Sequence, residues 1–418
     1  MSTRIGFIST RFAGTDGVTL ESAKWGEVLE REGHECFWFA GELDRDPAKS
    51  FFVSEAHFRH DQNQRINERI FGKVFRRSSV TEMIHALRSL LKVNLYEFIE
   101  RYNIELIIPE NVLAIPLHVP LGVALAEFIA ETQIPTIAHH HDFYWERDRF
   151  SLNAVGDYLH MAFPPKLAKI EHVVINSAAQ EELAHRTGIS STIIPNVFDF
   201  DNPPVINQEK SRGFRESIGL SPEDTMILQP TRVVQRKGIE HSIDLVRRLN
   251  DPRHKLVISH EAGDEGFEYF EWLKEYAKNQ GVDLRFISTM VADPWRRVDT
   301  TPGRYSLWDV YPHADFITYP SVYEGFGNAF LEAVFFRKPL LVNRYSIFIR
   351  DIEPMGFDLV VMDGFLTSKQ VQQVKEILNS PQRREQMVNH NFDIAKRHFS
   401  YELLRKRLNA LLTNFFGT

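Results

Sequence analysis

The residues best suited to chemistry lie at positions 319–333, which read YPSVYEGFGNAFLEA. This segment follows an apolar run typical of a strand and begins a helical pattern. Glycines at such a turn let backbone N–H groups approach an anion, and the start of a helix adds unpaired donors and the positive end of its dipole. Glu324 and Glu332 flank the turn, and carboxylates accept paired hydrogen bonds from sugar hydroxyls. We therefore expect a ligand with a phosphate centre and hydroxylated ends; the alternative is a turn in which Glu324 only helps to cap the helix.

A second candidate site is the loop at residues 229–239, which reads QPTRVVQRKGI and follows another predicted strand. Arg232 and Lys237 lie there before a glycine and a helical pattern. Two cations that converge at the carboxyl end of a strand can neutralise a diphosphate. A solvated basic loop would have the same composition, so that interpretation stays open.

Three consecutive histidines and an aspartate, His139 to Asp142, end a predicted strand in the first half. Neighbours on an extended segment face opposite sides, so His139 and His141 diverge from His140 and a compact three-histidine metal site is disfavoured. We predict no metal site. Histidines satisfied within the core are one alternative; the interpretation we prefer is that the cluster faces a substrate cleft.

The loop after the first predicted strand, residues 10–18, contains Gly14 and Gly17. It lacks the three-glycine fingerprint of dinucleotide-binding proteins, which disfavours an NAD-dependent oxidoreductase. An ordinary strand–helix turn is the alternative to a ligand-binding loop here.

Residues 65–92 combine basic side chains with apolar ones at helical spacing. The basic residues are Arg65, Arg69, Lys73, Arg76, Arg77, Arg88 and Lys92. Such a stretch could contact an anionic membrane or an anionic acceptor. We favour a solvated helical face packed on the first sheet.

Composition excludes several classes of protein. The chain has 418 residues, 43% of them hydrophobic, and a formal net charge of −7, which disfavours general nucleic-acid binding. The single cysteine excludes an internal disulfide framework and suits a reducing compartment. We see no targeting segment, and prolines and charge interrupt the apolar window at 112–130. These features predict a cytoplasmic protein.

The order of apolar and helical patterns predicts the α/β class, with two doubly wound, Rossmann-like domains that face a central cleft. Continuous hydrophobic runs indicate parallel strands covered on both faces. The predicted strands are 5–9, 35–39, 106–109, 136–139, 172–176 and 192–194, then 226–229, 255–259, 283–287, 316–319, 340–343 and 359–362. We expect domains at 1–204 and 205–395, and a terminal helix at 396–418 that can pack on either domain.

Taken together, the motifs resemble the GT-B glycosyltransferases, in particular the large retaining family 4. That family carries Arg-x4-Lys-Gly and then Glu-Gly-Phe-Gly-x4-Glu in its second domain, and both occur here in this order. The resemblance implies that Arg232 and Lys237 bind the diphosphate of a nucleotide-sugar donor. It also implies that Glu324 holds the donor sugar and Glu332 the ribose. The remaining donor-binding residues would be Gly325, Phe326, Gly327 and Asn328, through their backbone.

The same resemblance assigns roles in the first domain, which would bind the acceptor. Gly17 belongs to a loop over the donor phosphates, and Gly14 lies near the acceptor. The family has a histidine that contacts the donor sugar or helps the acceptor, and His141 corresponds to it best. His140 and Asp142, its neighbours in the sequence, would bind the acceptor.

The implied reaction is retaining transfer of a hexose to a hydroxyl, with Glu324, His141, Lys237 and Arg232 as the catalytic set. Charge develops on the departing diphosphate, so cations and a helix dipole suffice and no metal is obligatory, although a divalent metal could stimulate. The chain looks like solute-making members of the family, which would imply GDP-mannose, or else a UDP-sugar, and a small hydrophilic acceptor of glycerate type. A membrane-surface transferase acting on a lipid or polysaccharide precursor and a non-catalytic sugar-nucleotide-binding module are the alternatives. The oligomeric state stays open.

Overall fold

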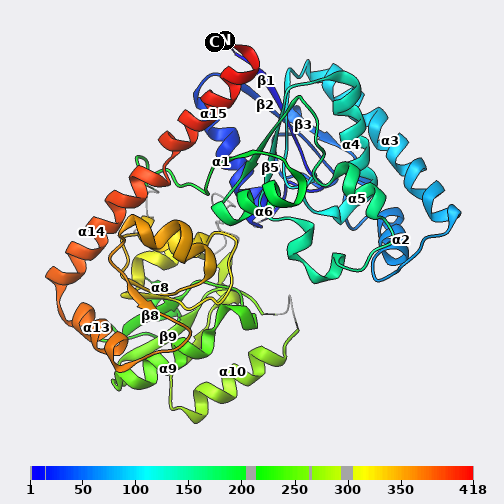
Figure 1. The fold of residues 1–418 in the computed structure, drawn as a ribbon. Helices are drawn as coiled ribbons and strands as arrows, with labels where there is room; N and C mark the ends of the chain where they lie inside the picture. The colour runs from blue at the N-terminus through cyan, green and yellow to red at the C-terminus, as the bar shows by residue number, and fades with distance from the viewer. Residues whose placement is uncertain (1, 15, 204–212, 263–265, 293–304, 418) are drawn as a thin grey trace. The chain divides into compact units, whose positions relative to one another are not determined.

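The computed structural model describes residues 2–14, 16–203, 213–262, 266–292 and 305–417. They form two compact units, each with its own parallel sheet (Figure 1). Unit 1 comprises residues 1–196 and 401–418, and unit 2 comprises residues 197–400. The boundary predicted at 204/205 lies outside the described residues.

The sheet of unit 1 has seven parallel strands in the order β3-β2-β1-β4-β5-β6-β7. Its strands are β1 (Arg4–Ile8), β2 (Glu35–Ala40), β3 (Ser50–Phe52), β4 (Leu106–Pro109), β5 (Thr136–His140), β6 (Ile170–Val174) and β7 (Ser191–Ile193). The order reverses at β1, so the carboxyl ends of β1 and β4 lie where ligands bind in such sheets. Most residues of β1, β4 and β5 are buried, as the continuous apolar runs predict.

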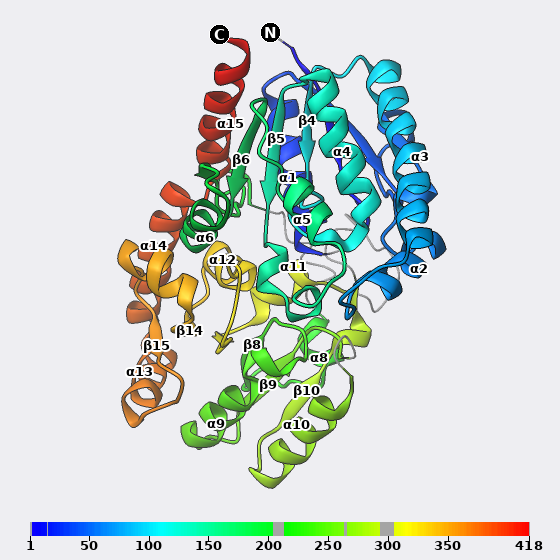
Figure 2. The same ribbon diagram turned by 45° about the vertical axis from the view of Figure 1, so that its right-hand side comes forward.

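Helices flank this sheet, and α3 and α4 lie side by side (Figure 2). The helices of unit 1 are α1 (Gly17–Arg31), α2 (Asp61–Ile70), α3 (Ser78–Tyr102), α4 (Val119–Thr132), α5 (Gly156–Ala162), α6 (Ser177–Thr187) and α15 (Tyr401–Phe416). No described helix combines the length and apolar character needed to span a membrane. The apolar window at 112–130 contains a short 3₁₀ turn and most of α4, which is buried.

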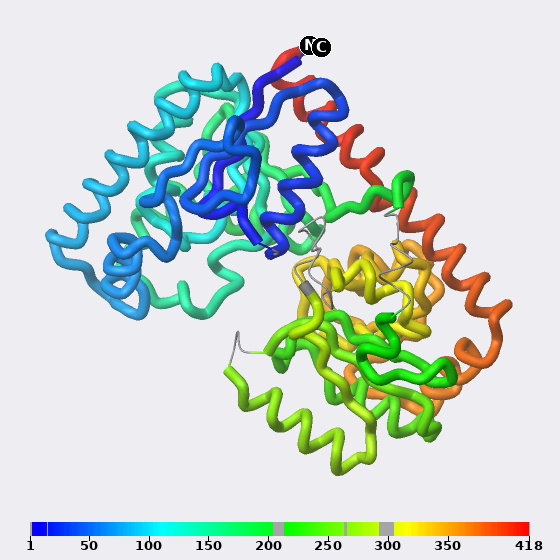
Figure 3. The backbone as a smooth tube through the Cα atoms, turned by 180° about the vertical axis from the view of Figure 1, so that it is seen from behind, coloured from blue at the N-terminus to red at the C-terminus, as the bar shows by residue number. Residues whose placement is uncertain are grey.

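The carboxyl-terminal helix α15 packs on α1, as the tube drawing shows (Figure 3). The Tyr401 hydroxyl donates to Glu27 Oε2 of α1 at 3.0 Å. The predicted helix at 396–418 is therefore divided: its first residues end α14 in unit 2, and the rest form α15 in unit 1.

The main sheet of unit 2 has six parallel strands in the order β10-β9-β8-β13-β14-β15. These strands are β8 (Thr225–Gln229), β9 (His254–Ile258), β10 (Leu284–Phe286), β13 (Phe316–Tyr319), β14 (Leu340–Asn343) and β15 (Val360–Met362). Two short strands, β11 (Val291–Ala292) and β12 (Tyr305–Ser306), pair separately. The helices are α8 (Phe214–Ser217), α9 (Ile239–Leu249), α10 (Glu268–Asn279), α11 (Leu307–Val310), α12 (Asn328–Phe335), α13 (Ser368–Asn379) and α14 (Pro381–His398).

The predicted strands are present, with shifts of one or two residues at their ends. The largest shift concerns the strand expected at 172–176, which is β6 at Ile170–Val174. Asn176 instead caps α6, because its side-chain oxygen accepts from the Ala179 N–H at 2.7 Å. A capping asparagine that follows an apolar run cannot be told from the last residue of a strand by pattern alone, so the predicted strand extends too far.

The basic stretch at 65–92 folds as the end of α2, a loop and the first part of α3. Arg88 and Lys92 form ion pairs with Glu127 of the neighbouring helix α4, at 2.9 and 3.0 Å. Arg76 pairs with Asp157 at 2.5 Å. These contacts agree with the solvated, packed face that the sequence analysis favours for this stretch.

Candidate functional site

The two motifs of unit 2 contact each other. The loop after β8 lies against the loop after β13, since the Val322 N–H donates to the Arg236 carbonyl at 2.9 Å. A Cβ atom at Gly238 would lie 2.6 Å from the Pro320 carbonyl oxygen, so only glycine allows the loops to come this close. Segments about ninety residues apart in the sequence thus form one site at adjacent strand ends.

Lys237 and Glu324 form an ion pair at this junction. Both residues are less than a tenth exposed. Burial lowers the pKa of Lys237 from its usual value, and the neighbouring carboxylate opposes that shift. Arg236 lies 3.8 Å from the other oxygen of Glu324. The cation predicted for a diphosphate and the carboxylate predicted for a sugar are therefore in direct contact.

The turn before α12 depends on Gly327. Its φ is +114°, and a Cβ there would lie 2.5 Å from the Tyr345 hydroxyl oxygen. That hydroxyl donates to the Phe326 carbonyl at 2.8 Å, and this hydrogen bond holds the backbone of the turn in place. Phe326 is buried, whereas Gly325 and Asn328, the first residue of α12, are partly exposed. The turn therefore presents the start of a helix, as expected of an anion site.

Glu332 and Arg232 belong to the same two segments as this centre. Glu332 is on α12, where it accepts from the buried Tyr311 hydroxyl at 2.7 Å. Arg232 is exposed, in the loop after β8. The pKa of His260, which follows β9, falls to about 4 because of burial and because Lys237 and Arg232 add positive charge. The two cationic side chains of the loop after β8 therefore lie near the carboxyl end of β9, where His260 is neutral at pH 7.

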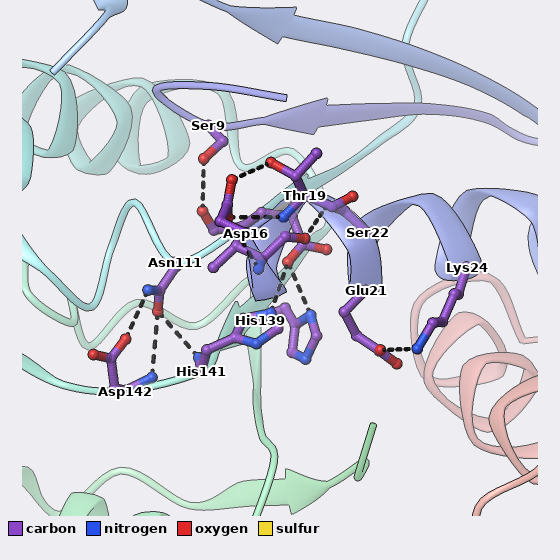
Figure 4. A network of polar contacts seen from close by, with 12 residues as sticks. Ser9, Asp16, Thr19, Glu21, Ser22, Lys24, Asn111, His139, His141 and Asp142 are labelled. Carbon is purple, nitrogen blue, oxygen red and sulfur yellow. Dashed lines mark hydrogen bonds and ion pairs between the residues drawn. The ribbon is translucent and has the colours of Figure 1, made fainter. Parts of the chain in front are cut away.

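The three consecutive histidines of unit 1 point to two different partners. His139 Nδ1 lies 2.9 Å from Glu110 Oε2, and His141 Nε2 lies 3.5 Å from the same oxygen (Figure 4). His140 points elsewhere and bonds through Nε2 to His172 Nδ1 at 2.9 Å. The structure therefore brings His139 and His141 together and separates His140, which is buried, from both.

Asn111 connects His141 to Asp142. Its side-chain oxygen accepts from the His141 backbone N–H at 3.0 Å, and its amide nitrogen donates to Asp142 Oδ1 at 2.9 Å (Figure 4). Arg147 pairs with the other oxygen of Asp142. Burial raises the pKa of Glu110 to about 7, an effect that His141 opposes. The cluster is a network of hydrogen bonds and ion pairs at the carboxyl ends of β4 and β5.

The loop of unit 1 that contains Gly14 and Gly17 supplies Asp16, whose side chain caps the start of α1. Gly17 is the first residue of α1, and Asp16 Oδ1 accepts from the N–H groups of Val18 and Thr19 at 3.2 and 3.1 Å. Gly14 has a φ of +81° and donates its N–H to Asp44 Oδ2 at 3.0 Å. A carboxylate of the chain therefore already satisfies two donors at the start of α1.

Residues 211–392 match the family model described as "Glycosyl transferases group 1". The chain is 33% identical to mannosylglucosylglycerate synthase of Thermotoga maritima, over 97% of this chain and 99% of that protein. The synthase of the same name from Petrotoga mobilis is 32% identical, over 96% of this chain and 99% of that protein. The chain belongs to the glycosyl transferases group 1.

Solved structures show that this group 1 glycosyltransferase has the GT-B fold. Anabaena HepE in complex with UDP and glucose superposes with a TM-score of 0.66 at 13% identity, covering 99% of this chain and all of the other. Sucrose-phosphate synthase of Thermosynechococcus elongatus superposes with a TM-score of 0.64 at 16% sequence identity, and the match covers 99% of each chain. The expected fold class, two Rossmann-like parallel-sheet domains, is confirmed, as are the family and the enzyme class of nucleotide-sugar-dependent hexosyltransferase.

Sequence reasoning missed four residues of the group 1 glycosyltransferase that hold the predicted site residues. Glu110 and Asn111 come directly after β4, next to the point where the strand order reverses, and that position could have revealed them. Tyr311 and Tyr345 gave no comparable signal, because only the fold brings them to α12 and its turn. Among the described residues, Glu110, His139 and His141 each offer a ligand atom within 4.8 Å of the others and could approach one metal ion.

Proposed function

We propose that this glycosyltransferase moves mannose from GDP-mannose to a hydroxyl of a small glycerate-type glycoside, with retention of configuration, as a cytoplasmic step in compatible-solute synthesis. A UDP-sugar is the alternative donor. Two relatives support this acceptor class, since both are named mannosylglucosylglycerate synthases and match over nearly their whole length. Unit 2 would bind the donor and unit 1 the acceptor.

The observation that carries the proposal is the contact between Lys237 and Glu324. A nucleotide sugar places a diphosphate next to a hexose, so its site needs a cation and a hydrogen-bonding carboxylate side by side. This pair lies beside the turn that opens α12, and Glu332, proposed for the ribose, lies about one turn into that helix.

The chemistry follows from charge that develops on the leaving diphosphate. Lys237, Arg232 and the positive end of α12 stabilise that charge and lower the barrier to departure of the nucleotide. Glu324 orients the hexose, and His141 acts near the transferred sugar or the acceptor hydroxyl. Attack on the same face as the leaving group would then give retention.

Two measurements test the proposal. A thermal-shift series with GDP, UDP, ADP and NAD should show the largest rise in melting temperature with GDP, because a ligand that binds only the native state stabilises it. Proton NMR of the product formed from GDP-α-mannose and glucosylglycerate should show an α-mannosyl linkage. Stabilisation by NAD alone would reject a sugar-nucleotide site, and a β-linkage would reject retention.

A membrane-surface acceptor is the second candidate, and one observation favours it. Val74 and Phe75, in the loop between α2 and α3, are 78% and 72% exposed, and basic residues flank them in the sequence. Exposed apolar side chains among cations suit an anionic bilayer. Co-sedimentation with phosphatidylglycerol vesicles, lost in a Phe75→Ser variant, would support this candidate; absence of binding would leave the small acceptor.

A further inference from the structure

A buried carboxylate and two imidazoles of unit 1 converge on one point. Glu110 follows β4, while His139 and His141 are two residues apart at the end of β5, so their side chains share a face of the sheet. The register brings the strands together, because Glu110 pairs with His139 in a parallel bridge and the Asn111 N–H donates to the His139 carbonyl at 2.8 Å. The two imidazole rings lie 4.4 Å apart between their centroids (Figure 4).

The cluster contains polar atoms without hydrogen-bond partners among the described residues. Glu110 and His139 are completely buried, yet Glu110 Oε1 and His139 Nε2 have no hydrogen-bond partner, and His141 Nε2 makes an ion pair with Glu110 Oε2 at 3.5 Å but no hydrogen bond. Unpaired polar atoms in the interior cost free energy, and a carboxylate costs more than a neutral group. Within the described part of the chain, the two histidines are the groups that form ion pairs with Glu110. A cation bound between the imidazoles and Glu110 Oε2 would neutralise the buried carboxylate.

We propose that Glu110, His139 and His141 bind one divalent transition-metal ion of the Zn²⁺ class. Bonds of about 2.0–2.1 Å in a tetrahedral arrangement place neighbouring ligand atoms roughly 3.3 Å apart. Glu110 Oε2 lies 2.9 Å from His139 Nδ1 and 3.5 Å from His141 Nε2, which brackets that value. Small rotations of the side chains would complete the site.

The donor set selects the kind of ion. Two imidazoles and one carboxylate suit Zn²⁺, Co²⁺ or similar ions, whereas Mg²⁺ and Ca²⁺ prefer sites made of oxygen atoms alone. Three protein ligands leave at least one coordination position open, as in sites that exchange a water molecule for a substrate oxygen. His141 is the least buried of the three side chains, so the ion would enter from its side.

The neighbouring histidine provides a matched control. His140 belongs to the same strand and is equally buried, but its ring bonds to His172 and points away from Glu110. Alternation along β5 keeps His140 away from His139 and His141, and the proposal of a metal site, contrary to the sequence-based prediction of none, rests on the carboxylate that the neighbouring strand adds. Removal of His140 should leave metal binding intact, whereas removal of His141 should abolish it.

Binding of Co²⁺ and Zn²⁺ to the chelator-stripped full-length protein tests this inference. We expect one ion per chain by elemental analysis, visible d–d absorption from bound Co²⁺ and a higher melting temperature with Zn²⁺. Glu110→Gln and His141→Gln should each weaken Co²⁺ binding at least tenfold, and His140→Gln should bind as the wild type does. A far-UV circular dichroism spectrum like that of the wild type, recorded without nucleotide, confirms that each variant is folded and keeps this test separate from that of the proposed function.

Two results would overturn the inference. One is a wild-type protein that binds no stoichiometric ion after it has been stripped and reloaded. The other is binding that Glu110→Gln and His141→Gln leave unchanged, which would place the ion elsewhere. In either case Glu110 would serve only as a hydrogen-bonding partner that holds the two imidazoles.

Discussion

Lys237 donates directly to Glu324, although 87 residues separate them in the sequence. Both side chains are about nine-tenths buried. In the absence of a ligand, the cation assigned to the donor diphosphate and the carboxylate assigned to the donor sugar neutralise each other. A bound donor would have to insert its own charge and hydroxyls into this contact, so each partner should affect turnover in its own way.

Replacement of Lys237 by Ala should reduce kcat roughly 100- to 1000-fold, because one group that stabilises charge on the leaving diphosphate is lost. Initial rates with saturating donor give the measurement. Lys274→Ala is the control, since Lys274 is an exposed lysine of the same unit. An unchanged rate in Lys237→Ala would remove this residue from the proposed mechanism.

Glu324→Gln should lower kcat more than it raises the KM for the donor. The amide keeps the size of the side chain but replaces one acceptor oxygen by an N–H donor and removes the negative charge, so the hexose is oriented less well during transfer. Steady-state kinetics over a range of donor concentrations separate the two constants. A variant that changes only KM would indicate that Glu324 contributes to binding alone.

Tyr311→Phe should raise the KM for the donor and leave kcat nearly unchanged. The tyrosine hydroxyl holds Glu332 at 2.7 Å, and without it the proposed ribose contact becomes mobile. The loss of one hydrogen bond should also cost about 1 kcal/mol of unfolding free energy. Urea denaturation measures the second effect independently of activity, and a lowered kcat at full stability would contradict the assignment to the ribose.

Gly327→Ala should lower both the melting temperature and the activity. A Cβ atom at φ +114° would collide with the Tyr345 hydroxyl and force the turn before α12 to move. Strain of this kind costs on the order of 1–3 kcal/mol. Gly156→Ala is the matched control, since that position has open space and no left-handed backbone. Equal melting temperatures for the two variants would show that the turn adapts.

His118 should make unit 1 less stable in acid. Its Nε2 donates to the Glu55 carbonyl at 2.8 Å and its Nδ1 accepts from the Leu121 N–H at 3.1 Å, so the neutral ring satisfies both contacts. Burial lowers the pKa of His118 to about 4, against 6.5 for an ordinary histidine. Between these values the unfolded chain binds the proton and the native state does not. The stabilisation is therefore complete above pH 6.5 and declines as the pH falls toward 4, by roughly 3 kcal/mol in all.

Urea unfolding of the wild type and His118→Asn over this pH range measures the effect. Asparagine can still cap α4 but does not titrate, so the stability difference between the two proteins should shrink as the pH falls. Parallel curves for both proteins would mean that His118 does not contribute to the acid sensitivity.

The sequence determined the parts of this protein that depend on local pattern. Continuous apolar runs such as those of β4 and β13 predict buried parallel strands, and the loops that follow β8 and β13 show the family motifs directly. These features are readable because a buried strand and a helix-opening glycine turn impose their residue types over only a few positions. Gly327 is an example, since its backbone conformation requires glycine.

The tertiary structure alone decided which groups meet. Nothing in the spacing of Lys237 and Glu324 shows that they touch, because strand order and not sequence distance sets that contact. In the same way, the alternation along β5 separates His140 from His139 and His141, but only the pairing of β4 with β5 supplies Glu110 to the two histidines. Side-chain partners across a sheet depend on register and topology, and a single sequence carries no local record of either.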